Sequence, residues 1–244
     1  MVGICAMGTV APAAASSSLK GEITVSAAAS VTDSFTALAK AFRAANPKVK
    51  VRLNFGSSST LVVQIQAGAP SDVIASADLS SAEKLVASGH VVASPRVFAR
   101  NSMAIAVKPG NPENVKSIKD LARLKTIAMC GKAAPCGVYA SSVLSRAGVV
   151  VKESNITRGV DAKATLGAVV TGDADAAIVY KTDVIAAGKS IHAVDIAASS
   201  NVKAAYGIAS IRGSKNGSLA KAFVDFVLSE QGLRILKGFG FQKP

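Results

Sequence analysis

Short hydrophobic runs alternate with segments of helical spacing along the first part of the chain. Runs typical of β-strands occupy residues 22–27, 49–55 and 73–76. Each is followed by a segment in which hydrophobic residues recur on one helix face, at residues 35–42, 61–65 and 82–86. A strand followed by a helix, three times over, predicts a parallel sheet with helices on both faces.

The same alternation continues after a connection at Pro95. Strands are predicted at residues 103–107, 126–129, 176–179 and 204–211. Helices are predicted around residues 118–121, after Pro135, near Asp161, from Asp183, and in two amphipathic segments over residues 219–236. This order is typical of an α/β protein with two lobes and a ligand cleft between them.

Composition indicates a folded globular protein and argues against a nucleic-acid partner. The chain has 244 residues, half of them hydrophobic and 18% charged, which is enough to bury a core. The net charge is +13, but the 28 Lys and Arg residues are scattered and never form a run of five. We therefore expect a solvated basic surface and no nucleic-acid interface.

The first twenty residues differ from the remainder. Residues 1–15 are small and apolar, three serines follow, and Ala13–Ala15 resembles a cleavage site, although a positively charged start is absent. We expect residues 1–20 to be a signal-like or disordered segment, and the protein to be periplasmic or extracytoplasmic. A lipid anchor at Cys5 is the less favoured alternative, because Ile4 is bulky. No later stretch is long and apolar enough for a membrane span, so the mature protein is expected to be soluble.

Cys130 and Cys136 are separated by only five residues. In an oxidising compartment a local disulfide is expected, and two free thiols are the alternative. A metal site is not expected, because His90 and His192 are distant in sequence and lack the spacing of metal ligands.

Three segments share a chemistry suited to anions. Residues 27–32, 56–60 and 134–137 each lead into a predicted helix and combine small residues with free backbone N–H groups, the first two with hydroxyls as well. For any one of them, helix capping by Ser or Thr is the simpler interpretation. Because helix N-termini bind anions and parallel strands end at one edge of a sheet, the three together predict a cage of uncharged donors.

Other functions find little support in the sequence. There is no Gly-x-Ser-x-Gly, Walker or His-Glu-x-x-His motif, so an enzyme is not expected, and neither is a cofactor. Asp72 and Asp78 lie near the ends of the strand predicted at residues 73–76, where a carboxylate more often caps a helix. Sugar binding is disfavoured because the chain lacks Trp, and ferric-iron binding because Tyr139, Tyr180 and Tyr206 are isolated in sequence.

Four segments resemble a known family. Ile23–Phe35, Phe55–Asp78, Pro135–Ala140 and Ala176–Asp183 are similar to the ModA-type molybdate-binding proteins, and they occur in that family's order. The resemblance implies a type II periplasmic binding protein of two lobes, each a mainly parallel sheet flanked by helices, joined by a hinge of two strands. It divides the chain into residues 21–99 with 206–244 as lobe I, and residues 100–205 as lobe II.

The resemblance also implies a set of ligand-binding positions: Ser30, Ser58, Cys136, Ala162 and Tyr180. The two serines would give hydroxyl and backbone N–H donors, the next two a backbone N–H each, and the tyrosine its hydroxyl. Asp161 stands beside a donor position, where an inward-pointing carboxylate would repel an anion. We therefore expect Asp161 to face away or to cap a helix.

A cage of pure donors favours molybdate or tungstate, which are fully deprotonated dianions near neutral pH. Hydrogen phosphate carries a proton that needs an acceptor, and leaving that proton unpaired costs roughly 1–3 kcal/mol. Sulfate has the same donor requirement as molybdate, so only the size of the cage could exclude it. The sequence does not separate molybdate from tungstate.

The resemblance further implies partners: an ABC permease and its ATPase, which would receive the anion from a monomeric binding protein. The main alternative is a binding protein for sulfate or another tetrahedral oxyanion, or an effector-sensing domain. An enzyme of the porphobilinogen-using kind is a remoter alternative. It would need a catalytic Asp and an arginine cluster in the cleft, and the cleft segments contain neither.

Overall fold

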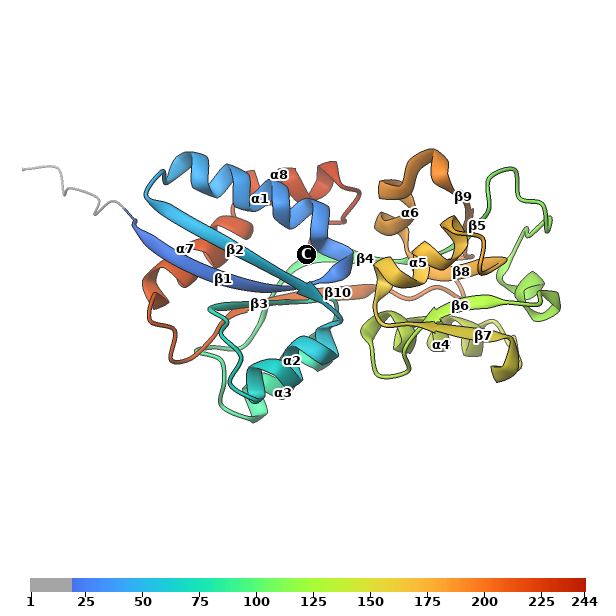
Figure 1. The fold of residues 1–244 in the computed structure, drawn as a ribbon, viewed down its shortest axis with the longest axis horizontal. Helices are drawn as coiled ribbons and strands as arrows, with labels where there is room; N and C mark the ends of the chain where they lie inside the picture. Colours follow the sequence, from blue (N-terminus) through green and yellow to red (C-terminus); the bar gives the residue numbers. More distant parts are fainter. Residues whose placement is uncertain (1–18) are drawn as a thin grey trace, which may run out of the picture.

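The computed structural model describes residues 19–244 and has two lobes, each built on its own five-stranded sheet (Figure 1). The predicted signal-like segment and Cys5 therefore lie outside the described residues, apart from Leu19 and Lys20. Within residues 19–244, none of the helices combines the length and the apolar character needed to cross a bilayer.

The sheet of lobe I has the strand order β2-β1-β3-β10-β4. Its strands are β1 (Gly21–Ala28), β2 (Val49–Gly56), β3 (Val73–Ser76), β4 (Arg96–Asn101) and β10 (Ala204–Ser210). The first three are parallel as predicted, whereas β10 runs antiparallel to both β3 and β4. The sheet is therefore mixed, because one strand returns to it from the other lobe.

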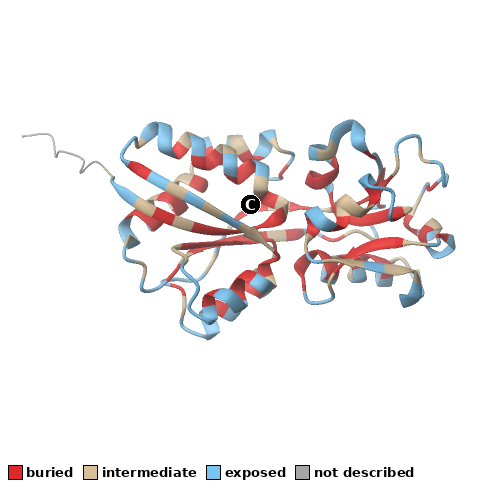
Figure 2. Ribbon diagram, in the orientation of Figure 1, coloured by how far each residue is buried: buried red, intermediate tan, exposed pale blue. Residues whose placement is uncertain are grey.

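Helices cover both faces of this sheet (Figure 1). They are α1 (Thr32–Ala45), α2 (Ser58–Gln66), α3 (Leu79–Ala87), α7 (Gly217–Val227) and α8 (Glu230–Gly238). The helices α1, α7 and α8 pack on one face, where Phe35, Phe42 and Phe223 meet edge to face. The helices α2 and α3 lie on the other face, where Leu61 of α2 and Leu85 of α3 pack in one cluster with Ile74 of β3. Figure 2 shows that β3 and β10 between these layers are largely buried, whereas the edge strand β2 is mostly intermediate or exposed.

The sheet of lobe II has the order β7-β6-β8-β5-β9. Its strands are β5 (Met103–Val107), β6 (Ile127–Cys130), β7 (Ile156–Gly159), β8 (Ala176–Tyr180) and β9 (His192–Asp195), and its α-helices are α4 (Pro135–Arg146), α5 (Ala162–Val170) and α6 (Lys181–Ala187). The strands β6, β7 and β8 are parallel, while β5 runs against β8 and β9. The sequence did not predict β4, β7 or β9. The last two are short, partly exposed edge strands with little hydrophobic pattern.

The chain passes between the lobes twice. It leaves the first sheet at Asn101, the end of β4, and enters the second at Met103; it returns between Asp195 and Ala204, the start of β10. The side-chain amide of Asn201 bonds both backbone groups of Met103 and so ties the two connections together. The predicted boundaries at 99/100 and 205/206 fall inside β4 and β10, close to these crossings.

Candidate ligand-binding site

Several chain segments end at one small cavity between the lobes. Lobe I contributes the carboxyl ends of β1 and β2 and the start of α2, and lobe II contributes the starts of α4 and α5 and the end of β8. The residues that line the cavity are Ala28, Ala29, Ser30, Gly56, Ser57, Ser58, Ala77, Pro135, Cys136, Asp161, Ala162 and Tyr180. Only about 10 Å³ is open to the centre of a water molecule, so the lobes are closed tightly around it.

All five residues that the sequence predicted as ligand contacts line this cavity. Ser30 and Ser58 come from lobe I, whereas Cys136, Ala162 and Tyr180 come from lobe II. The fold therefore brings together residues that are far apart in sequence: Ser30 and Tyr180 are separated by 150 positions. Their contact with an anion stays a prediction.

The helices that start at the cavity have free N-termini. No side chain caps the turn at Ala29–Val31, α2 or α4, so backbone N–H groups of their first turns lack such a partner. This corrects the simpler interpretation of the serines in residues 27–32 and 56–60 as helix caps. Such N-termini carry a partial positive charge and favour an anion.

Two of the three aspartates singled out in the sequence cap helices, and of the three only Asp161 lines the cavity. Asp161 accepts the Ala164 N–H at 2.9 Å at the start of α5, as expected from the sequence. Asp78 likewise caps α3 by accepting the Ser81 N–H at 3.1 Å. Asp72 instead accepts the Thr24 N–H at 2.7 Å and joins two strands of lobe I. The side chains that remain for a ligand in the cavity are therefore hydroxyls.

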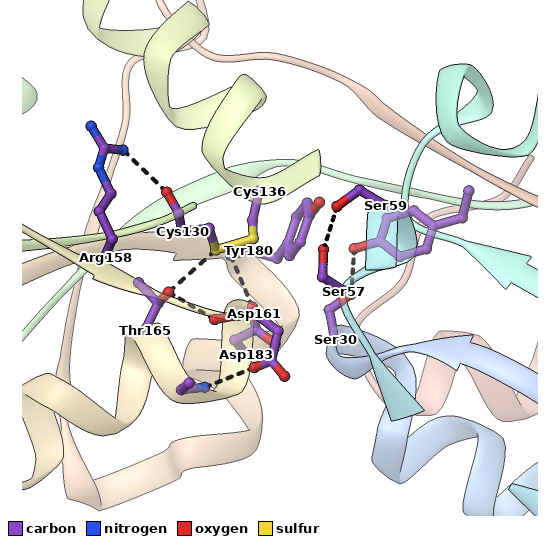
Figure 3. Close-up of a disulfide and its surroundings, with 12 residues drawn as sticks. Ser30, Ser57, Ser59, Cys130, Cys136, Arg158, Asp161, Thr165, Tyr180 and Asp183 are labelled. Carbon is purple, nitrogen blue, oxygen red and sulfur yellow. Dashed lines mark hydrogen bonds between the residues drawn. A yellow bond between two sulfur atoms is a disulfide. The ribbon is translucent and has the colours of Figure 1, made fainter. Parts of the chain in front are cut away.

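The two serine hydroxyls are held by neighbouring groups. The Ser58 Oγ is buried and accepts the backbone N–H of Ala77 at 3.0 Å. The Ala77 N–H engages one lone pair of this oxygen and cannot accept a proton, so the Ser58 proton remains available for another acceptor. The Ser30 Oγ lies 3.1 Å from the Tyr206 hydroxyl, on the lobe I side of the cavity in Figure 3.

The environment of the Tyr180 hydroxyl bears most directly on ligand binding. Its side chain lies between the disulfide and the serines in Figure 3 and is 1% exposed. Among the described residues, its hydroxyl is the buried side-chain polar atom that has no hydrogen-bond partner. Burial raises the pKa of Tyr180 well above its usual value, so this hydroxyl keeps its proton at neutral pH and is a donor. Leaving such a group unpaired costs roughly 1–3 kcal/mol, which a ligand in the cavity would recover.

A disulfide joins Cys130, at the end of β6, to Cys136, in the first turn of α4, as the sequence predicted (Figure 3). It closes a tight loop, within which the Ala134 N–H bonds the Gly131 carbonyl at 2.9 Å. Gly137 packs so closely that an added Cβ would lie 2.2 Å from the Gly131 oxygen. The loop that carries the Cys136 N–H is therefore held rigidly.

The three tyrosines are isolated in sequence but stack in the fold. Tyr180 meets Tyr139 and Tyr206 edge to face, with ring centroids 6.3 and 5.6 Å apart. Burial raises the pKa of Tyr139 to about 12 and that of Tyr206 well above its usual value. These phenols therefore keep their protons at neutral pH. Within residues 19–244 there is also no cluster of three or more His, Cys, Asp or Glu residues that could hold a metal.

A larger cavity of about 300 Å³ lies beside the first and shares Ser30 with it. It is lined by the start of α1, by α5 and α6 with the turn that follows α5, and by the C-terminal segment, and half of its lining residues are polar or charged. At its edge, Lys163 of lobe II pairs with Asp33 of lobe I at 3.3 Å. Asp183, which also borders it, is buried and accepts the Tyr180 N–H at 3.0 Å.

Comparison with known proteins gives the family. Residues 23–242 match the family described as bacterial extracellular solute-binding protein. The chain is 33% identical to the molybdate-binding protein ModA of Mycobacterium tuberculosis, with 100% of this chain and 94% of the relative covered. This chain is a ModA-type member of the bacterial extracellular solute-binding proteins.

Two solved structures share the fold of this ModA-type protein. The periplasmic molybdate-binding protein of Azotobacter vinelandii superimposes with a TM-score of 0.82 at 23% identity, over 91% of this chain and 99% of the other. The sulfate-binding protein SubI of Mycobacterium tuberculosis gives 0.81 at 20% identity, over 91% and 86%. Both likenesses establish the two-lobed α/β fold that the sequence predicted. Neither likeness identifies the ligand of this chain, because one of these two proteins is named for molybdate and the other for sulfate.

Proposed function

We propose that this ModA-type protein captures molybdate or tungstate outside the cytoplasm and delivers the anion to an ABC import permease. The observation that carries the proposal is the buried, unpartnered hydroxyl of Tyr180, which lines a cavity with two serine hydroxyls and three uncapped helix starts. A doubly negative tetrahedral guest would pair that hydroxyl and accept from the surrounding donors. The molybdate-binding names of the relatives support the same ligand.

The donor set explains selectivity against protonated anions. No lysine or arginine lines the cavity, and the one carboxylate there, Asp161, is engaged in a cap. Molybdate, tungstate and sulfate offer only acceptors, so such donors satisfy them fully. Hydrogen phosphate would leave its proton unpaired, which lowers its affinity roughly ten- to a hundredfold. Sulfate would be excluded only by the size of the closed cage.

Capture would proceed by hinge closure. The predicted donors come from both lobes, so only the closed arrangement completes the set, and the anion therefore biases the protein toward closure. The two connections at Ser102 and residues 196–203 are the natural hinge. The permease would recognise the closed form of a monomer, and the ATPase would drive release. This role needs no cofactor besides the bound anion and no catalysis.

The test is a calorimetric titration of the protein with molybdate, tungstate, sulfate and phosphate, followed by Tyr180→Phe. The variant removes the unpartnered hydroxyl and retains the ring. We expect molybdate affinity to fall about tenfold or more, since a hydrogen bond to a charged group contributes roughly 1.5–3 kcal/mol. Tyr139→Phe is the matched control, because Tyr139 does not line the cavity, and it should bind as wild type.

Two outcomes would contradict the proposal. Equal affinity for sulfate and molybdate would favour a general oxyanion-binding protein. An unchanged molybdate affinity in Tyr180→Phe would place the ligand elsewhere.

A further inference from the structure

A chain of buried hydrogen bonds runs from lobe II to the Ser30 hydroxyl through both connecting strands. Asn101, the last residue of β4, donates from Nδ2 to the Thr182 hydroxyl at 2.9 Å and to the Tyr206 hydroxyl at 3.3 Å. Tyr206, on β10, lies 3.1 Å from Ser30. Asn101, Thr182 and Tyr206 are all buried, and Ser30 alone of the four borders the small cavity.

The direction of this chain follows from its first member. The Asn101 Oδ1 accepts the backbone N–H of Ser102 at 2.9 Å, which fixes the amide with its NH₂ group toward Tyr206. The Tyr206 oxygen therefore accepts from Asn101. Its own proton then has one acceptor among its neighbours, the Ser30 Oγ, and would otherwise stay buried and unpaired.

We propose that Tyr206 and Asn101 are positioning residues that fix Ser30 as a hydrogen-bond donor, and thereby help the site to reject anions that carry a proton. With Tyr206 donating to one of its two lone pairs, the Ser30 hydroxyl cannot turn its proton toward Tyr206, and this proton is left for an acceptor in the cavity. The inference rests on the proposed function, since it assigns the source of selectivity within the same site.

Ser58 is also left as a hydrogen-bond donor, but through a backbone group. Its oxygen accepts the Ala77 N–H, which can donate and never accept, so no side-chain substitution at Tyr206 can change it. Ser30 depends instead on a side-chain hydroxyl. Removing that hydroxyl would leave both Ser30 lone pairs and its rotation unconstrained, so that Ser30 could turn to accept the proton of hydrogen phosphate, while the Ser58 donor stays as it was.

The experiment is Tyr206→Phe, which preserves a ring that packs edge to face on Phe98 and Phe241. We expect molybdate affinity to fall about two- to tenfold. The phosphate-to-molybdate affinity ratio, measured by competition at pH 8, should rise about tenfold, whereas the sulfate-to-molybdate ratio should stay constant. A loss of packing alone would weaken all three anions alike. Tyr139→Phe, the matched control, should leave both ratios unchanged.

A double-mutant cycle isolates the route through Ser30. In the Ser30→Ala background, adding Tyr206→Phe should leave the phosphate-to-molybdate ratio unchanged, because no hydroxyl remains to be redirected. A further change there would overturn the inference. So would an unaltered ratio in Tyr206→Phe alone, including phosphate binding that stays undetectable in both proteins.

A neutron structure of the unliganded protein tests the same direction without any anion. We expect the Tyr206 proton on the line to the Ser30 oxygen. A Ser30 proton pointing at Tyr206 would refute the inference even if molybdate binds. If the wild-type protein binds none of the four anions, the proposed function fails. The neutron structure then decides by itself whether Tyr206 donates its hydrogen bond to Ser30.

Discussion

At the scale of single residues, burial sets the chemistry of the cleft. Asp183 is fully enclosed, and desolvation raises its pKa to about 7, although its bond from the Tyr180 N–H acts in the opposite direction. In an unfolded chain the pKa of the same carboxyl is near 3.8. Between these values the folded protein holds a proton that the unfolded chain has lost.

This difference predicts a stability that falls as pH rises. The contribution of the neutral Asp183 is complete below about pH 4 and is lost as pH passes 7, so the free energy of unfolding should be about 1 kcal/mol higher at pH 6 than at pH 8. Asp183→Asn keeps an acceptor for the Tyr180 N–H and should flatten this dependence. Urea denaturation at both pH values measures the free energy of unfolding. If Asp183→Asn showed the same pH dependence as the wild type, Asp183 would not be its source.

At the scale of elements, the loop between β6 and α4 shows how a donor is held in place. The Cys130–Cys136 disulfide closes a loop of a few residues, and the tight packing of Gly137 against it leaves little freedom. The backbone N–H of Cys136 is thus presented from a rigid support, as a preorganised binding group requires.

Opening this disulfide should weaken both stability and binding. For so short a loop, the lost constraint on the unfolded chain is worth about 2 kcal/mol. Cys130→Ser with Cys136→Ser should therefore unfold at lower urea concentration, and its molybdate affinity should fall several-fold. Reducing agent should act likewise on the wild type and leave the double variant unaffected. A variant as stable as the wild type would show that the loop is held by its other contacts.

At the scale of the whole molecule, two sheets joined by two connections place the cavity where both lobes meet. The Lys163–Asp33 pair bridges the lobes, but both side chains are about half exposed, so it contributes little to closure. The buried contacts between the lobes, such as the Asn101–Thr182 hydrogen bond and the Tyr180–Tyr206 stacking, therefore matter more for closure than this exposed pair.

We expect molybdate to compact the protein in solution. Small-angle scattering should give a smaller radius of gyration at saturating molybdate than without it, and phosphate at the same concentration should have no such effect. At a molybdate concentration of 100 times Kd, the protein should also gain about 2.7 kcal/mol of stability. Binding without any change in the radius would contradict hinge closure.

Local pattern was sufficient for much of this protein. Helix and strand periodicity predicted most elements, and the small residues with hydroxyls in residues 27–32 and 56–60 predicted an anion site. The capping role of Asp161 also followed, because a carboxylate at a helix start has a nearby N–H to accept. Each of these properties depends on residues within one or two turns of each other.

Other properties depend on contacts that no local pattern records. No local pattern marks β7 and β9, because short edge strands acquire their pairing from neighbours already in place. Tyr206 is isolated from other tyrosines in the sequence. In the fold, the return of the chain through β10 places its hydroxyl beside Ser30, which is 176 positions away. Whether a hydroxyl donates or accepts is settled by its partners, and those partners meet only when both lobes are folded.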